Sequence, residues 1–123
     1  MKVTIYHNPA CGTSRNTLAL IREAGHEPEI VEYLKTPLSR ADIVSLLGHM
    51  NTPAHELVRS KEGLFKELGL DGANVSEAQM IDAMAAHPIL VNRPVVAVED
   101  GGKVTARLCR PADLVTELLA LAR

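Results

Sequence analysis

The order of apolar patterns in the first third of the chain is the feature that most constrains its fold. A β-type run over residues 3–6 ends at Asn8-Pro9, because a residue before proline is pushed toward extended geometry. Residues 12–24 carry apolar side chains at helical spacing, and Gly25 provides a natural helix stop. A second β-type run follows over residues 29–34. These segments predict a compact βαβ unit, whose right-handed crossover makes the two strands parallel.

The next fifty residues change to a helical pattern. Segments 39–42 and 76–79 each begin with serine and carry Asp or Gln three residues later, which is the arrangement of a capping box. Thr52-Pro53 fits a helix start, with threonine as the N-cap and proline as the first helical residue. The last of these helices should end at His87-Pro88, because proline interrupts helical hydrogen bonding. We therefore expect four short helices in an insert over about residues 38–87.

The last third of the chain predicts a hairpin and a helix. Residues 95–98 form a continuous apolar run, typical of a strand covered on both faces, and Asp100-Gly101-Gly102 turns the chain back into a strand over 104–108. Pro111 fits the first position of a final amphipathic helix. A βαβ half and a ββα half that share one mixed four-stranded sheet resemble the thioredoxin-like fold. We expect a single α/β domain over residues 1–123, interrupted by the helical insert.

Composition and charge exclude several classes of function. Thirteen Lys and Arg against 15 Asp and Glu give a net charge of −2, which provides no overall basic field for nucleic acid or anionic lipid. Two tyrosines, one phenylalanine and no tryptophan leave few surfaces on which bases could stack. No run approaches the roughly 18 apolar residues of a membrane span, and no apolar signal-peptide stretch follows Met1. We expect a cytoplasmic protein with neither nucleic acid nor membrane as a partner.

Cys11 is the strongest candidate for a reactive residue. It lies in the loop between the first predicted strand and helix, where unpaired N–H groups and the helix dipole stabilise a thiolate. His7 and Arg15 are candidate cationic neighbours, and segment 12–14, Gly-Thr-Ser, can direct N–H and O–H donors at an anion. The alternative is that Cys11 is only a small buried apolar residue and Gly12 a turn residue, against which the place of Cys11 in the loop argues.

The other cysteine and the histidines indicate no second reactive centre. Ser14 stands where a Cys-x-x-Cys motif would have its second cysteine, so the loop cannot close its own disulfide and an external thiol is needed. Cys109 is either a resolving thiol or, as we expect, a core residue, because a free cysteine is usually buried. The five histidines show no metal-ligand spacing, and we expect no metal site.

Three segments resemble one family. Residues 7–16 (HNPACGTSRN), 87–94 (HPILVNRP) and 107–111 (RLCRP) are similar to the motifs of the glutaredoxin-coupled arsenate reductases, so the resemblance spans nearly the whole chain. It implies a thioredoxin-like fold with a helical insert, and a cis peptide before Pro94. It also implies the roles of the site residues. Cys11 is the nucleophile, and His7 and Ser14 are further catalytic residues. Gly12, Thr13 and Arg15 are loop contacts, and the oxyanion is bound by Arg59, Arg93 and Arg110.

The resemblance implies a reaction without a bound cofactor. The Cys11 thiolate attacks arsenate, glutathione as co-substrate attacks the adduct, and a glutaredoxin completes the reduction to arsenite. Two other functions stay open on the same fold. One is a glutathione-dependent thiol oxidoreductase with a different substrate, because an anion site also suits the carboxylates of glutathione. The other is a thiol-sensing transcription regulator, against which Ser14 argues because such a switch uses two cysteines. A non-enzymatic docking role for the leucine-rich insert is less favoured, because its helices must bury those leucines anyway.

Overall fold

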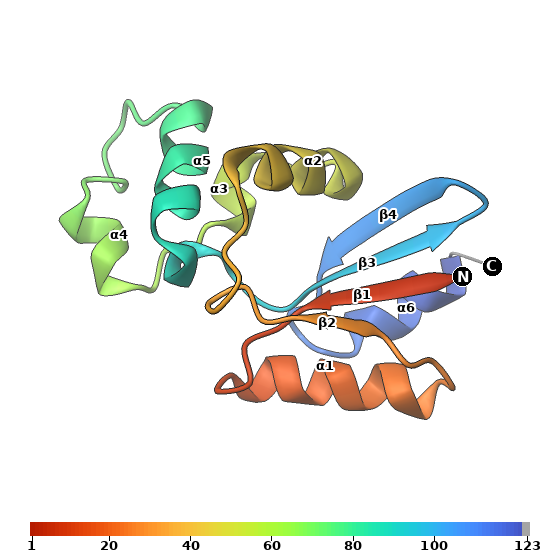
Figure 1. Cartoon of the computed structure of the whole chain (residues 1–123). Helices are drawn as coiled ribbons and strands as arrows, with labels where there is room; N and C mark the ends of the chain where they lie inside the picture. The colour runs from red at the N-terminus through yellow and green to blue at the C-terminus, as the bar shows by residue number, and fades with distance from the viewer. Residues whose placement is uncertain (122–123) are drawn as a thin grey trace. The chain divides into compact units, whose positions relative to one another are not determined.

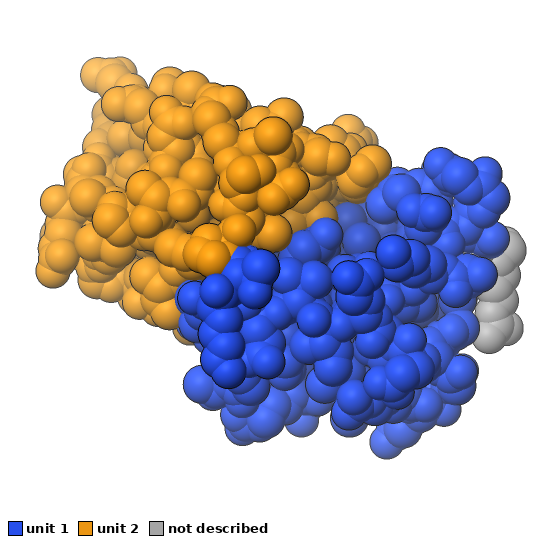
Figure 2. Space-filling view, viewed as in Figure 1, with its two compact units in different colours: residues 1–36, 93–123 blue, residues 37–92 orange. Residues whose placement is uncertain are grey.

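The computed structural model describes residues 1–121 (Figure 1). The chain divides into two compact units, coloured separately in Figure 2. Unit 1 comprises Met1–Thr36 and Arg93–Arg123, and unit 2 comprises Pro37–Asn92. In residues 1–121, no helix has the length and apolar character that crossing a membrane requires.

Unit 1 is a mixed four-stranded sheet with two helices. The strand order is β2-β1-β3-β4, in which β1 pairs parallel with β2 and antiparallel with β3, and β3 pairs antiparallel with β4. The predicted βαβ and ββα halves and their mixed sheet are therefore confirmed. The elements are β1 (Lys2–Tyr6), α1 (Gly12–Glu23), β2 (Glu29–Val31), β3 (Val95–Asp100), β4 (Lys103–Leu108) and α6 (Leu114–Leu121).

One apolar core holds α1 and α6 against the same face of this sheet (Figure 1). Val3 and Ile5 alternate with half-buried residues along β1, which is the period of a strand with one face in a core. Ile21 from α1 and Leu118 from α6 complete this core and are at most 1% exposed. Because α1 is fixed along its length, the loop at its N-terminus is held at the end of β1.

Unit 2 contains the predicted helices. They are α2 (Arg40–Met50), α3 (Ala54–Leu57), α4 (Gly63–Glu67) and α5 (Glu77–Ala86), followed by a single 3-10 turn, η1 (Pro88–Leu90). Both capping boxes are confirmed, since Ser39 exchanges hydrogen bonds with Asp42 and Ser76 does so with Gln79. Reciprocal bonds of this kind satisfy N–H groups that the first helical turn leaves unpaired.

Three predicted boundaries are wrong. The second strand ends at Val31 instead of residue 34, because the N–H of Lys35 turns back to the carbonyl of Glu32 at 2.9 Å. The N-cap of α3 is Pro53, and its first N–H donates to Glu77 at 2.6 Å, so a side chain from α5 replaces the expected threonine cap. Pro111 precedes α6 by three residues, in a turn where the N–H of Leu114 donates to its carbonyl at 3.1 Å.

The core of unit 1 generates a stability prediction on α6. Leu118→Ala should lower the free energy of unfolding by about 3 kcal/mol, because it leaves a cavity where a fully enclosed side chain was. Leu121→Ala on the same helix is the matched control and should change it by less than about 0.5 kcal/mol, since Leu121 is 75% exposed. Urea denaturation followed by circular dichroism measures both. Equal losses would contradict this description of the core.

Candidate active site

The loop between β1 and α1 is built around Asn8. The side-chain oxygen of this buried asparagine accepts the N–H of Ala10 at 3.0 Å, and its carbonyl accepts the N–H of Cys11 at 3.0 Å. The preceding residue, His7, is tied to the sheet by its N–H, which donates to Val31 at 2.8 Å. Cys11 then takes the N-cap position of α1 with extended backbone angles. Its half-buried side chain therefore stands at the positive end of a 12-residue helix.

A buried polar pair, His7 and Ser14, holds this loop in place. The Nδ1 atom of His7 lies 2.6 Å from the hydroxyl oxygen of Ser14, which also accepts the N–H of Asn8 at 3.1 Å. All three residues are buried. Burial lowers the pKa of His7, although the carboxylate of Glu32 opposes this effect. His7 is therefore a neutral imidazole near pH 7, and its partner is Ser14.

The charged neighbour of the Cys11 sulfur is Arg110. One nitrogen of its guanidinium, Nη1, lies 3.6 Å from Sγ and also donates to the carbonyl of Arg93 at 2.9 Å. Burial by itself raises the pKa of the Cys11 thiol, but the N–H of Ser14, the guanidinium of Arg110 and the N–H of Thr13 stabilise the thiolate. Together they hold the pKa below its ordinary value. Cys11 thus has the electrostatic surroundings of a nucleophile.

Arg93 takes part through its main chain and is itself a buried cation. The residue is 6% exposed, and its carbonyl orients Arg110. The Arg93–Pro94 peptide is cis, as the resemblance implied, and the carbonyl of Pro94 accepts the N–H of Cys109 at 2.9 Å. The Arg110–Pro111 peptide is also cis, which no sequence signal indicated.

The two cysteines have opposite surroundings. Cys109 is fully enclosed in the core of unit 1, and burial raises its pKa to about 12, with Arg107 opposing the effect. Its thiol donates to the carbonyl of Arg107 at 3.6 Å. A thiol that stays protonated at neutral pH is a poor nucleophile. Of the two roles considered from sequence, the surroundings of Cys109 favour the core residue.

The remaining candidates occupy two places. Gly12 and Thr13 form the first turn of α1, and Arg15 folds back so that its guanidinium donates to the carbonyl of Pro9 at 3.0 Å. His7 and Arg15, which the sequence suggested as the cations at the sulfur, thus direct their hydrogen bonds to Ser14 and Pro9.

Arg59 belongs to unit 2 and is fixed within that unit. Its Nη1 donates to the side-chain oxygen of Asn92 at 3.1 Å, and its Nε lies 3.5 Å from the carboxylate of Glu62. Its N–H donates to Leu90 at 2.7 Å, beside the isolated bridge of Val58 with Val91. Sequence reasoning did not find Glu62 or Asn92. The i, i+3 spacing of Arg59 and Glu62 was the available signal.

No group of three or more His, Cys, Asp or Glu side chains that could hold a metal ion occurs in the described part of the chain. Unit 1 instead brings together a cysteine stabilised as a thiolate, a guanidinium at its sulfur, and the main chain of a second, buried arginine that holds this guanidinium. Such a set can hold a tetrahedral oxyanion beside a nucleophile, since guanidinium groups match its oxygens in pairs.

Comparison with known proteins places the chain in a family. The sequence model of the ArsC family matches residues 6–118. The chain belongs to the ArsC family. It is 50% identical over 119 residues to an arsenate reductase of Rhizobium meliloti, covering 97% of this chain and 82% of that protein. It is 47% identical over 117 residues to an arsenate reductase of Escherichia coli K12, covering 95% and 80%.

A solved structure agrees with this ArsC membership. The arsenate reductase of Vibrio cholerae superposes with a TM-score of 0.87 at 40% identity, covering 95% of this chain and 97% of that one. The expected thioredoxin-like fold and the family resemblance are both confirmed by these matches.

The surroundings of the two thiols in this ArsC chain predict their reactivity. Iodoacetamide should alkylate Cys11 at a rate that rises with pH through a midpoint below that of an ordinary thiol, while native Cys109 stays unmodified. In Arg110→Ala the midpoint should move to higher pH, because the thiolate loses a hydrogen bond and a positive charge. Mass spectrometry after timed alkylation measures both sites.

Arg107→Ala is the matched control, because Arg107 is an arginine that pairs with Glu117 and lies beside the other cysteine. It should leave the Cys11 profile unchanged. An Arg110→Ala profile that overlays the unsubstituted chain would show that this guanidinium does not stabilise the Cys11 thiolate.

Proposed function

We propose that this ArsC-family chain is an arsenate reductase, with Cys11 as its nucleophile. The observation that carries the proposal is the guanidinium of Arg110 at 3.6 Å from the Cys11 sulfur, in a loop whose N–H groups also favour the thiolate. The relatives named above support arsenate as the substrate. Arsenate is a tetrahedral oxyanion with an electrophilic centre, which suits a thiolate beside guanidinium groups.

The first step joins sulfur to arsenic. Arg93 and Arg110 hold the oxygens of arsenate and neutralise the charge that would repel a thiolate. The family resemblance assigns oxyanion binding to Arg59 as well. The Cys11 sulfur forms a bond to arsenic while the bond from arsenic to one hydroxyl oxygen breaks, and this oxygen takes a proton from solvent and leaves as water. Arsenic stays As(V) in this step. The neutral His7 and Ser14 hold the loop so that the sulfur keeps its direction.

The reducing electrons come from external thiols. Glutathione attacks the arsenic of the adduct, its thiol proton joins a leaving hydroxide, and water departs. A glutaredoxin thiolate then attacks the glutathione sulfur, and a mixed disulfide forms between glutaredoxin and glutathione. The bond between the glutathione sulfur and arsenic breaks, and its electron pair passes to arsenic. The resulting As(III) is hydrolysed from Cys11 as arsenite. This scheme uses no bound cofactor, and its thiols require a reducing compartment such as the cytoplasm.

The two other functions considered from sequence differ in what they require. A thiol-sensing regulator needs a second cysteine near Cys11, and that position is Ser14, whose hydroxyl is occupied by His7. A glutathione-dependent oxidoreductase with another substrate would use the same Cys11 thiolate. Turnover that depends on arsenate separates it from the proposed function.

Cysteine variants test the proposal directly. With arsenate, glutathione, glutaredoxin, glutathione reductase and NADPH, the unsubstituted chain should show arsenate-dependent oxidation of NADPH. Cys11→Ser should reduce this rate by roughly 1000-fold or more, because the attacking atom is lost. Cys109→Ala should keep at least about half of it, because that thiol is protonated and enclosed.

Two results would contradict the proposal, and each contradicts a different part of it. Equal losses in Cys11→Ser and Cys109→Ala, with both variants folded by circular dichroism, would replace the single-thiol scheme with an internal disulfide. An absence of arsenate-dependent turnover in the unsubstituted chain would reject arsenate reduction itself.

Substitutions of Arg93 should affect the KM for arsenate, whereas Arg110→Ala should shift the alkylation midpoint of Cys11. Arg93→Lys and Arg93→Ala should raise KM for arsenate, by about 10-fold or more for alanine, since a charge-assisted bond of roughly 1.5–3 kcal/mol is lost. The alkylation midpoint of Cys11 should move little, because Arg93 orients Arg110 through its carbonyl, which every substitution keeps. Initial rates against arsenate concentration, combined with the alkylation profile, measure both. An Arg93→Ala variant with an unchanged KM would remove this side chain from the oxyanion site.

A further inference from the structure

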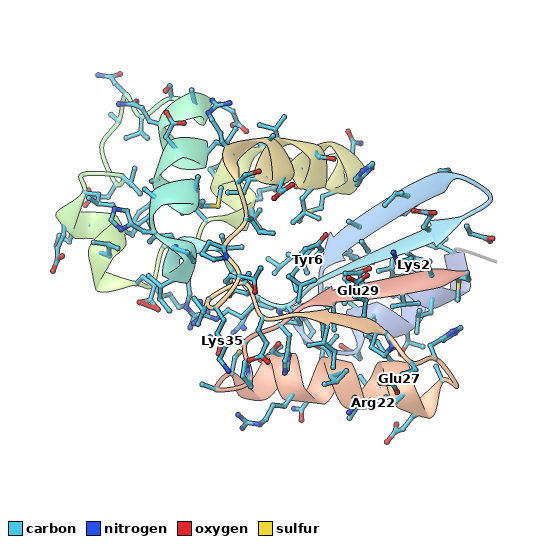
Figure 3. The ribbon with its side chains drawn as sticks, in the orientation of Figure 1. Lys2, Tyr6, Arg22, Glu27, Glu29 and Lys35 are labelled. Atoms are coloured by element: carbon cyan, nitrogen blue, oxygen red, sulfur yellow. The ribbon has the colours of Figure 1, made fainter. Side chains whose placement is uncertain are left out.

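Four arginines in residues 1–121 lie at ion-pair distance from a carboxylate. Figure 3 labels one such pair, Arg22 on α1 and Glu27 in the loop before β2, at 3.0 Å. Three more arginines are paired in the same way. They are Arg40 with Asp82 at 2.6 Å, Arg59 with Glu62 at 3.5 Å and Arg107 with Glu117 at 3.0 Å. Each of these four guanidinium groups therefore already has a carboxylate beside it.

Arg15 and Arg110 are different, and both flank Cys11. Each directs one guanidinium nitrogen to a main-chain carbonyl, Arg15 to Pro9 at 3.0 Å and Arg110 to Arg93 at 2.9 Å. Within residues 1–121, no carboxylate lies at ion-pair distance from either of them. A carbonyl orients a guanidinium without cancelling its charge, so both groups keep their capacity to bind an anion.

Their positions differ in a way that assigns them different anions. Arg110 is half-buried and touches the sulfur, which suits the oxyanion under attack. Arg15 is exposed, and its N–H donates to the carbonyl of Cys11 in the first turn of α1. Its guanidinium lies over Gly12, where Nη2 would be 3.7 Å from a Cβ atom. An oriented, uncancelled cation is thus present at the exposed side of the loop that carries the nucleophile.

We propose that Arg15 binds a carboxylate of the thiol co-substrate, glutathione, as it approaches the adduct on Cys11. The inference rests on the proposed function and adds the residue that recognises the second substrate. Glutathione carries two carboxylates, and a guanidinium fork binds a carboxylate through two parallel hydrogen bonds. Arg15 holds glutathione while the glutathione sulfur forms its bond to arsenic. The thiol proton joins the hydroxide that leaves arsenic, and water departs.

Steady-state kinetics test this role with a matched control on the same helix. Arg15→Ala should raise KM for glutathione about fivefold, as expected for losing one exposed charge pair. KM for arsenate should stay within about twofold, because Arg15 does not touch the sulfur or the oxyanion site. Arg22→Ala, which removes an exposed arginine of α1 already paired with Glu27, should change neither constant. Arg15→Lys keeps the charge without the fork and should fall between.

A second comparison identifies the carboxylate as the group recognised. The diethyl ester of glutathione should be a poorer co-substrate than glutathione for the unsubstituted chain, and this preference should disappear in Arg15→Ala. An unchanged KM for glutathione in Arg15→Ala, or a preference against the ester that persists in it, would overturn the proposal.

A reaction without arsenate separates this inference from the proposed function. The Cys11 thiolate attacks a disulfide, forms a mixed disulfide and releases one thiolate, which mass spectrometry follows. The unsubstituted chain should react faster with glutathione disulfide than with the uncharged hydroxyethyl disulfide. Arg15→Ala should reduce the ratio of these two rates about fivefold. If the ratio falls while arsenate is not reduced, only the proposed function fails. If arsenate is reduced while the ratio and the KM for glutathione are unchanged, only the role of Arg15 fails.

Discussion

The site of this protein depends on one nitrogen atom, Nη1 of Arg110. It donates both to the carbonyl of Arg93 and toward the sulfur of Cys11, and so links the end of β4 with the start of β3 and the N-terminus of α1. A guanidinium held only by the thiolate would be free to turn toward water. The fixed carbonyl removes that freedom and leaves the positive charge intact. Favourable electrostatics at the sulfur thus follow from the sheet topology, because β1 and β3 are neighbours.

The loop that presents Cys11 is supported by polar groups taken out of water. His7, Asn8 and Ser14 are all buried, and each has a hydrogen-bond partner within the loop. Burying such groups is costly unless they are satisfied, so the network holds the loop in one arrangement. The same burial keeps His7 uncharged. Thiolate stabilisation therefore falls to main-chain N–H groups and to Arg110.

The architecture was predictable from sequence because it follows local periodicity. The alternation along β1, the apolar run of β3 and the two capping boxes each depend on residues a few positions apart, and each is confirmed. One of the three wrong boundaries depends on a partner distant in sequence, and the other two depend on single turns, from Lys35 back to Glu32 and from Leu114 back to Pro111. The cap of α3 comes from Glu77, 23 residues away, and no local pattern encodes it. At the site, Cys11 was identifiable from its loop, but its contact with Arg110, 99 residues away, was reachable only through the family resemblance.

The burial of Cys109 determines where the reducing electrons can reside. Its thiol is enclosed in the core, and Ser14 replaces the partner that a two-cysteine loop would have. The described chain therefore has no second reactive thiol with which to store an electron pair between turnovers. In the proposed reaction each cycle draws both electrons from soluble thiols at the moment of use. The rate of such a catalyst would depend on the concentration of reduced thiols in its compartment, and the protein would return to the same reduced state after every turnover.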